Sequence, residues 1–132
     1  MGEEGGGTVR RAERVAAVKA ALAQSIEAAK KRGAVIVCDI DRVERDDGAF
    51  GCCALASLDV AKVRGPRVPF VKNADEMARE WDSVEAGFDG IDPKIACCQD
   101  NTRVLADFWR VGLELRQMFR PVTADAFLRG AP

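Results

Sequence analysis

The sequence contains no histidine and no tyrosine among its 132 residues. Histidine is the side chain that most often carries protons near neutral pH, and it is the commonest nitrogen ligand of protein-bound metals. Any catalysis by this chain must therefore use carboxylates, thiols, hydroxyls, lysine or a bound cofactor. Ser25, Ser57 and Ser83 have no imidazole to activate them, which excludes the ordinary Ser-His-Asp hydrolases.

The chain also lacks an excess of charge of one sign and a long apolar run. Lysine and arginine total 20 against 21 aspartates and glutamates, without the basic excess that favours nucleic-acid binding, so we predict no nucleic-acid partner. No stretch has the length of a transmembrane helix, and residues 1–7 lack the apolar segment of a secretory signal. We expect no membrane association and a location in the cytoplasm or another reducing intracellular compartment.

The length and a hydrophobic content of 48% are sufficient for one domain with a buried core. We expect residues 1–7, rich in glycine and glutamate, to form a flexible N-terminal tail, and residues 8–132 to form a single α+β domain. Its predicted order is an N-terminal helix from Thr8 to Gly33, a β-hairpin, and two C-terminal helices packed on the sheet.

The hairpin is predicted from the apolar and β-branched composition of residues 34–40, continued by residues 42–45. The Asp46-Asp47-Gly48 turn signal follows, and residues 49–55 are apolar again. Beyond it two interpretations stay open, because Ser57 is suited to capping a short helix but the strand could also continue to Val63.

Two helices are predicted in the C-terminal half. Asn73 with Glu76 forms a capping box for a helix that ends near Gly87, and Asp92-Pro93 is a strong start signal for a helix that continues to Phe119. The second helix has an unusually broad apolar face, so it either forms the central helix of the core alone or also contacts a partner. The candidate interface residues are Val104, Phe108, Trp109, Val111 and Leu115. After the stop at Pro121, residues 123–128 are predicted to form a final turn that docks Phe127.

Two aspartates, at positions 39 and 41, lie at the end of the apolar strand predicted here. If the strand continues through them, Asp39 and Asp41 lie on the same face, because side chains alternate along a strand. Carboxylates at this spacing are suited to sharing a cation or binding a small ligand, so Asp39 and Asp41 are the candidate ligand or metal residues. Alternatively, they are solvent-facing charges that prevent the edge of the hairpin from pairing with another chain.

A strand followed by Asp-x-Asp resembles the first motif of the haloacid-dehalogenase phosphotransferases. The resemblance implies a phosphotransferase in which these carboxylates act as nucleophile and acid. It covers this short segment only, and Arg42 and Val43 stand where that family usually has glycine and threonine.

The five cysteines include two adjacent pairs, Cys52-Cys53 and Cys97-Cys98. Structural metal sites favour Cys-x-x-Cys, because two intervening residues let both sulfurs point at one ion. Adjacent cysteines face opposite sides of a strand and lie about 100° apart on a helix. We therefore interpret these residues and Cys38 as small, buried hydrophobic side chains with reduced thiols, and we predict no metal at the cysteines.

These observations favour a non-enzymatic intracellular binding or assembly protein that self-associates through its apolar C-terminal helix. The predicted partner is a second copy or another protein, and no cofactor is predicted. The alternative is a small-ligand-binding protein or metal-assisted enzyme that uses Asp39 and Asp41, so the sequence leaves open whether the protein is an enzyme.

Overall fold

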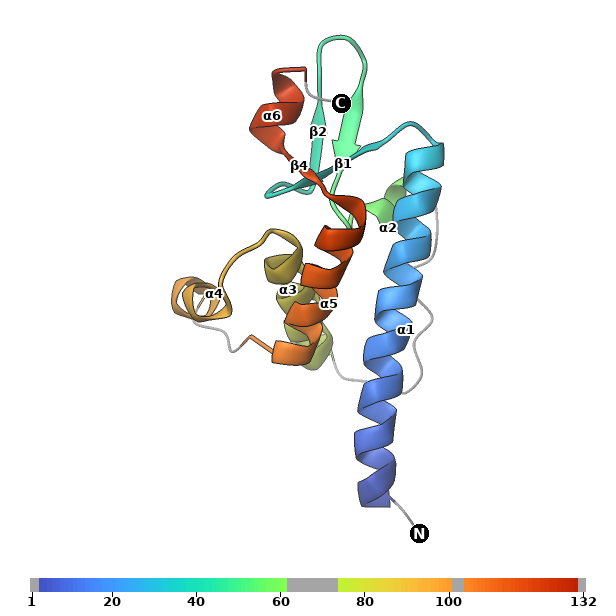
Figure 1. Ribbon diagram of the computed structural model, residues 1–132, viewed down its shortest axis with the longest axis vertical. Coiled ribbons are helices and arrows are strands. Elements are labelled where there is room, and N and C mark those ends of the chain that lie inside the picture. The colour runs from blue at the N-terminus through green and yellow to red at the C-terminus, as the bar shows by residue number, and fades with distance from the viewer. Residues whose placement is uncertain (1–2, 62–73, 101–103, 131–132) are drawn as a thin grey trace.

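A long N-terminal helix, α1 (Glu3–Lys31), runs along one side of the molecule, beside a small sheet and several shorter helices (Figure 1). The structure is a computed structural model, which describes residues 3–61, 74–100 and 104–130. Its mixture of helices with a four-stranded sheet confirms the predicted α+β class, a small single-domain fold.

The ends of α1 differ in how well the sequence predicts them. The helix begins at Glu3, so the start predicted at Thr8 is wrong; glycine lowers helix propensity by about 1 kcal/mol per residue without forbidding the helical backbone. The predicted end is confirmed. Gly33 has φ 94° and donates its amide to Lys30 at 2.9 Å, while Ala34 donates to Ala29 at 3.1 Å, which is a Schellman motif. The division into a tail over residues 1–7 and a domain over residues 8–132 stays a prediction.

The sheet has the order β2-β3-β1-β4, with β1 between two strands that run parallel to it. The strand bounds are β1 Val35–Cys38, β2 Arg42–Glu44, β3 Phe50–Cys52 and β4 Val122–Thr123. β2 and β3 form an antiparallel hairpin. Their turn contains Gly48 with φ 89° and is closed by the Arg45 amide, which donates to Ala49 at 2.8 Å. The predicted hairpin is thus confirmed for residues 42–52.

The segment predicted as one strand from residue 34 to residue 45 is instead divided by a bend at residues 39–41. Asp39 takes the left-handed backbone conformation with φ 64°, which stops β1 and turns the chain toward β2. β3 consequently lies beside β1 in parallel, and β2 forms the outer edge. The sequence pattern does not reveal this division, because apolar and β-branched residues favour a strand on either side of the bend.

Helices make up most of the rest of the described chain. Their bounds are α2 Ser57–Val60, α3 Ala74–Phe88, α4 Pro93–Asp100, α5 Ala106–Phe119 and α6 Ala124–Leu128. The helical alternative for the segment after Ser57 is therefore confirmed as far as Val60. The cap predicted at Asn73 and the loop or edge strand around residues 68–71 lie outside the described residues.

Two local predictions in the C-terminal half are confirmed. The Asp92 carboxylate accepts the Lys94 amide at 2.8 Å, and α4 begins at Pro93. The final turn also forms: Thr123 caps α6 by accepting the Ala126 amide at 3.1 Å, and Phe127 is buried. At both helix starts, a main-chain N–H donates to a side chain only two or three residues earlier. Because the cause is local, the sequence predicts these helix starts.

The single helix predicted from Pro93 to Phe119 is wrong. Leu105 has extended backbone angles, φ −86° and ψ 114°, and its amide donates to the hydroxyl of Ser83 at 2.9 Å. This contact with α3 fixes the start of α5, and α4 lies apart from it (Figure 1). The cause is a hydrogen bond to a residue 22 positions earlier, which helical periodicity cannot reveal.

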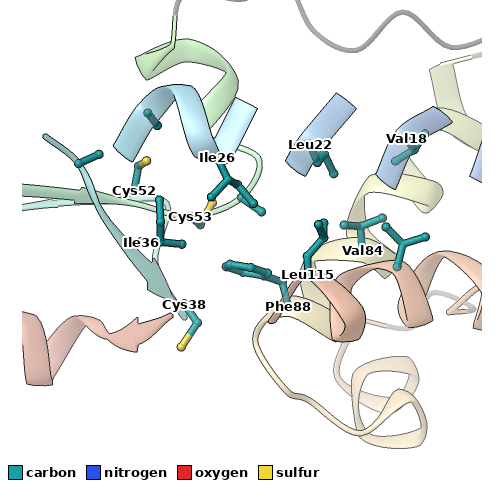
Figure 2. Close-up of a cluster of buried hydrophobic side chains, with 14 of the residues drawn as sticks. Val18, Leu22, Ile26, Ile36, Cys38, Cys52, Cys53, Val84, Phe88 and Leu115 are labelled. Carbon is teal, nitrogen blue, oxygen red and sulfur yellow. The ribbon is translucent and has the colours of Figure 1, made fainter. Parts of the chain in front are cut away.

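One buried cluster joins α1, β1, β3, α3 and α5 (Figure 2). Leu22 and Ile26 of α1 meet Ile36 of β1, and Phe88 and Leu115 complete the contact from α3 and α5. The sheet is therefore anchored to the helices by the same core that holds the helices to one another. Among the described residues, no helix has the length and apolar character required to cross a bilayer.

Candidate functional site

The bend at residues 39–41 carries both aspartates predicted to bind a ligand. The Asp39 carboxylate accepts the amide of Ala124 at 3.1 Å, whereas the Asp41 carboxylate accepts the thiol of Cys53 at 3.7 Å. The side-chain directions thus follow from the bend and not from strand alternation. The predicted shared face is wrong, and the two carboxylates have different partners.

Asp41 belongs to a cluster with Cys53 and Glu85. One oxygen from each carboxylate and the Cys53 sulfur all lie within 4.8 Å of one another. The three residues come from the bend after β1, the residue after β3, and the last turn of α3. Cys53 is 2% exposed, Glu85 is half-buried, and Asp41 is exposed. The cluster therefore extends from the core to the surface.

The backbone around the sulfur is well fixed. The Cys53 amide donates to the carbonyl of Asp41 at 2.9 Å, and the Ala56 amide donates to the Cys53 sulfur at 3.4 Å. β1 and β3 are parallel, so Asp41 and Cys53 both follow the carboxyl ends of adjacent parallel strands. The crevice outside such strand ends is where open α/β sheets usually bind ligands.

Two groups of the cluster, the Glu85 carboxyl and the Cys53 thiol, have raised pKa values. Burial raises the pKa of Glu85 to about 7, and the hydrogen-bonded carboxylate of Asp41 adds to this effect, as do the charges of Asp89 and Asp82. Burial also raises the pKa of the Cys53 thiol to about 12, with a smaller contribution from Asp41 and Glu85. Carboxylates this close share a proton or a cation, because both cannot be ionised without repulsion.

Asp89 extends this acidic group by one helical turn. Its carboxylate accepts the amide of Asp39 at 2.9 Å. Burial raises the pKa of Asp89, whereas the Asp39 amide and the Arg116 guanidinium lower it and the charges of Asp39 and Asp41 raise it. Both predicted aspartates therefore lie near the Asp89 carboxylate, just after α3, although they do not face each other on a strand.

A surface depression of about 640 Å³ opens beside the cluster. Asp41 and Glu85 line it, together with the apolar side chains of Leu55 and Ala56. Arg42 and Asp59 of α2 also line it and form an ion pair with each other. An ion or small ligand at the cluster would thus be accessible from this depression.

The predicted interface residues mostly face the interior of their own chain. Phe108, Val111 and Leu115 are at most 1% exposed. Val104 and Trp109 are half-buried, and the Trp109 indole donates to the carbonyl of Ile91 at 2.9 Å. Intramolecular packing accounts for the broad apolar face of α5, while Met118 is 56% exposed on the same helix.

Sequence reasoning missed Glu85 and Asp89 as neighbours of Asp39 and Asp41. The one available signal is their spacing, since residues four apart lie on the same face of a helix. Cys53 is buried, as predicted for a small hydrophobic side chain, yet its thiol contacts a carboxylate. The free thiols of Cys38 and Cys52 are buried as well.

Comparisons with known proteins leave the interpretation to the geometry. Protein-family models, the curated proteins and the solved structures were all searched with this chain, and none of the three searches gave a match.

Proposed function

We propose that the protein binds a divalent metal ion through Asp41, Cys53 and Glu85, and that the depression beside them admits a small ligand to that ion. The observation that carries this proposal is the convergence of three ligand atoms, from three separate elements, within 4.8 Å of one another. This proposal develops the alternative prediction in which Asp41 binds a ligand or metal. It adds Cys53 and Glu85, which the sequence does not indicate as ligands.

The donor set favours zinc. Thiolate ligands select zinc over magnesium and calcium, which prefer oxygen ligands alone. In a tetrahedral zinc site, metal–sulfur and metal–oxygen distances separate the sulfur and oxygen ligands by about 3.6 Å. The Cys53 sulfur lies 3.7 Å from the Asp41 oxygen, so this pair requires little movement to meet an ion. Three protein ligands with access from a depression are typical of zinc sites that also bind water or substrate.

Charge also supports a cation. The exposed Asp41 carboxylate and the half-buried Glu85 carboxylate approach each other. A bound cation would stabilise this pair in place of a shared proton. The thiol of Cys53 would have to lose its proton on binding, and zinc lowers the pKa of a coordinating thiol enough for this. When bound, zinc would supply Lewis acidity; this chain supplies the fixed ligands and the apolar wall formed by Leu55 and Ala56.

Titration with Co²⁺ tests this proposal, because a thiolate bound to cobalt gives a charge-transfer absorption band. We expect a band from the full chain, and we expect Zn²⁺ to displace the cobalt. Cys53→Ser should abolish the band, and Glu85→Gln should weaken binding by more than the roughly 10- to 100-fold that loss of an outer contact costs.

Cys52→Ser is the matched control, since Cys52 is the adjacent, equally buried thiol and lies outside the cluster. This variant should keep the cobalt band. A band that survives Cys53→Ser, or that disappears equally in Cys52→Ser, would place the metal elsewhere and contradict the proposal.

Self-association through α5 stays a prediction. Phe108, Val111 and Leu115 are buried within their own chain. The exposed surface of α5 therefore has fewer apolar residues that could contact a partner. Light scattering of the purified chain measures the outcome: the mass of two chains is expected if α5 self-associates, and the mass of a single chain over a wide concentration range contradicts it.

A further inference from the structure

We propose that Asp89 is a positioning residue of the metal site, which fixes the backbone of Asp39 and thereby the bend that carries Asp41. This inference rests on the proposed metal site and adds a residue that contacts no proposed ligand atom. The contact that carries it is the hydrogen bond from the Asp39 amide to the Asp89 carboxylate, 2.9 Å long.

Asp89 is itself held firmly. It directly follows α3, and the next two residues close the helix: the Gly90 amide donates to Gly87 at 3.1 Å, and the Ile91 amide donates to Ala86 at 2.9 Å. Gly90 has φ 75°. These features form a Schellman motif, which defines the position of the residue before the glycine. The carboxylate of Asp89 is therefore a fixed acceptor next to the bend.

The bend needs such an acceptor because its conformation is intrinsically unfavourable. The left-handed conformation costs residues with a side chain up to about 1–2 kcal/mol, and aspartate adopts it more readily than most; Asp39 has φ 64°. Its amide is held by Asp89, and its own carboxylate accepts the Ala124 amide at 3.1 Å. Two residues later, the carbonyl of Asp41 accepts the Cys53 amide at 2.9 Å. The bend is thus held at both ends, and Asp89 is the support at its beginning.

Glu85 lies in the last turn of α3 and Asp89 directly follows the helix, so this end of α3 supplies one ligand directly and supports another through the bend. Outer-shell contacts of this kind orient metal ligands, and their loss weakens metal binding by about 10- to 100-fold. If Asp89 lost its acceptor, the bend could relax and Asp41 would no longer be held against Cys53.

Zinc affinity of the full-length chain, measured by competition with a chromophoric chelator, tests this role. Asp89→Ala removes the acceptor and should weaken binding by about 10- to 100-fold. Asp89→Asn removes the charge but retains an oxygen acceptor, so this variant should keep a zinc affinity close to that of the original chain. The cobalt band should shift in Asp89→Ala and remain unchanged in Asp89→Asn.

Asp82→Ala is the control for charge. The Asp82 carboxylate is exposed and contributes to the raised pKa of Glu85, but among the described residues it makes no hydrogen bond to the bend. This variant should weaken binding less than Asp89→Ala does. If Asp89→Asn weakens binding as strongly as Asp89→Ala, charge and not hydrogen bonding is responsible, and the positioning role is overturned. If Asp89→Ala does not fold, a loss of about 10-fold or more in the zinc affinity of Asp89→Asn relative to the original chain overturns the positioning role by itself.

The two proposals fail in different ways. An original chain that binds no zinc overturns the metal site and with it the positioning role. An original chain that binds zinc through Cys53, with unchanged affinity in Asp89→Ala, overturns the positioning role alone.

Discussion

Gly87 of α3 and Gly112 of α5 lie where the two helices pack backbone against backbone. A Cβ atom on Gly87 would come 1.9 Å from the carbonyl oxygen of Trp109, and one on Gly112 would come 1.9 Å from that of Val84. Only glycine permits this approach. The contact fixes α3 against α5. Because α3 carries Glu85 and is directly followed by Asp89, the proposed site depends on this contact.

Gly112→Ala should destabilise the protein markedly. Alanine improves helix propensity by about 1 kcal/mol, but its methyl group would overlap the α3 backbone, and overpacking costs about 1–3 kcal/mol or more. Because the overlap is deep, 1.9 Å to a backbone oxygen, we take the upper end of that range and expect a net loss of about 2 kcal/mol in the free energy of unfolding. Urea denaturation measures this.

Gly48→Ala is a useful comparison for the glycine prediction. Gly48 has φ 89° but no atom within 4 Å of a Cβ position, so alanine there should cost only about 1–2 kcal/mol of backbone strain. A Gly112→Ala variant as stable as the original chain would show that α3 and α5 separate without cost.

The buried ion pair between Arg14 of α1 and Glu80 of α3 should be sensitive to single substitutions. Their side chains are 2% and 3% exposed, and the closest contact is 2.7 Å. Arg14→Met alone should destabilise the protein by about 3–5 kcal/mol, because it removes the guanidinium that donates hydrogen bonds to the buried Glu80 carboxylate. The midpoint of urea unfolding measures this loss.

The double variant Arg14→Met with Glu80→Leu should recover most of the loss from the single substitution, because an apolar pair of similar volume is often as stable as a buried ion pair. Lys19→Met provides the exposed comparison: its pair with Glu114 has side chains 37% and 43% exposed, and such pairs contribute at most about 1 kcal/mol. Equal losses in Arg14→Met and Lys19→Met would contradict the prediction.

The metal-free protein should lose stability as the pH rises toward neutrality. Burial raises the pKa of Glu85 from 4.5 to about 7. Between these values the folded state binds more protons than the unfolded state, so the free energy of unfolding falls as the pH increases through this range. Urea denaturation with a chelator present, at several pH values between about 4.5 and 8, measures the slope.

Glu85→Gln should flatten this pH dependence, because the amide keeps the hydrogen-bonding shape without titrating. Glu27→Gln is the control, since Glu27 is an exposed carboxylate on α1, and it should leave the slope unchanged. If Glu85→Gln retains the original slope, the stability change arises from another group.

Several elements follow from the sequence alone because their causes are local. Gly33 ends α1, Asp92 caps α4, and Thr123 caps α6, in each case through hydrogen bonds to residues a few positions away. The turn around Gly48 likewise depends on neighbouring residues and on the freedom of glycine to adopt positive φ. Composition and hydrophobic pattern are sufficient for the α+β class.

The tertiary structure decided the features on which the proposed function depends. Ser83 captures the amide of Leu105 and separates α5 from the preceding chain. Asp89 and Ala124 hold Asp39 in the bend that divides the expected strand. The meeting of Asp41 with Cys53 and Glu85 joins segments that are distant in sequence. Local propensity and periodicity describe each segment by itself, whereas these contacts form only when packing brings the segments together.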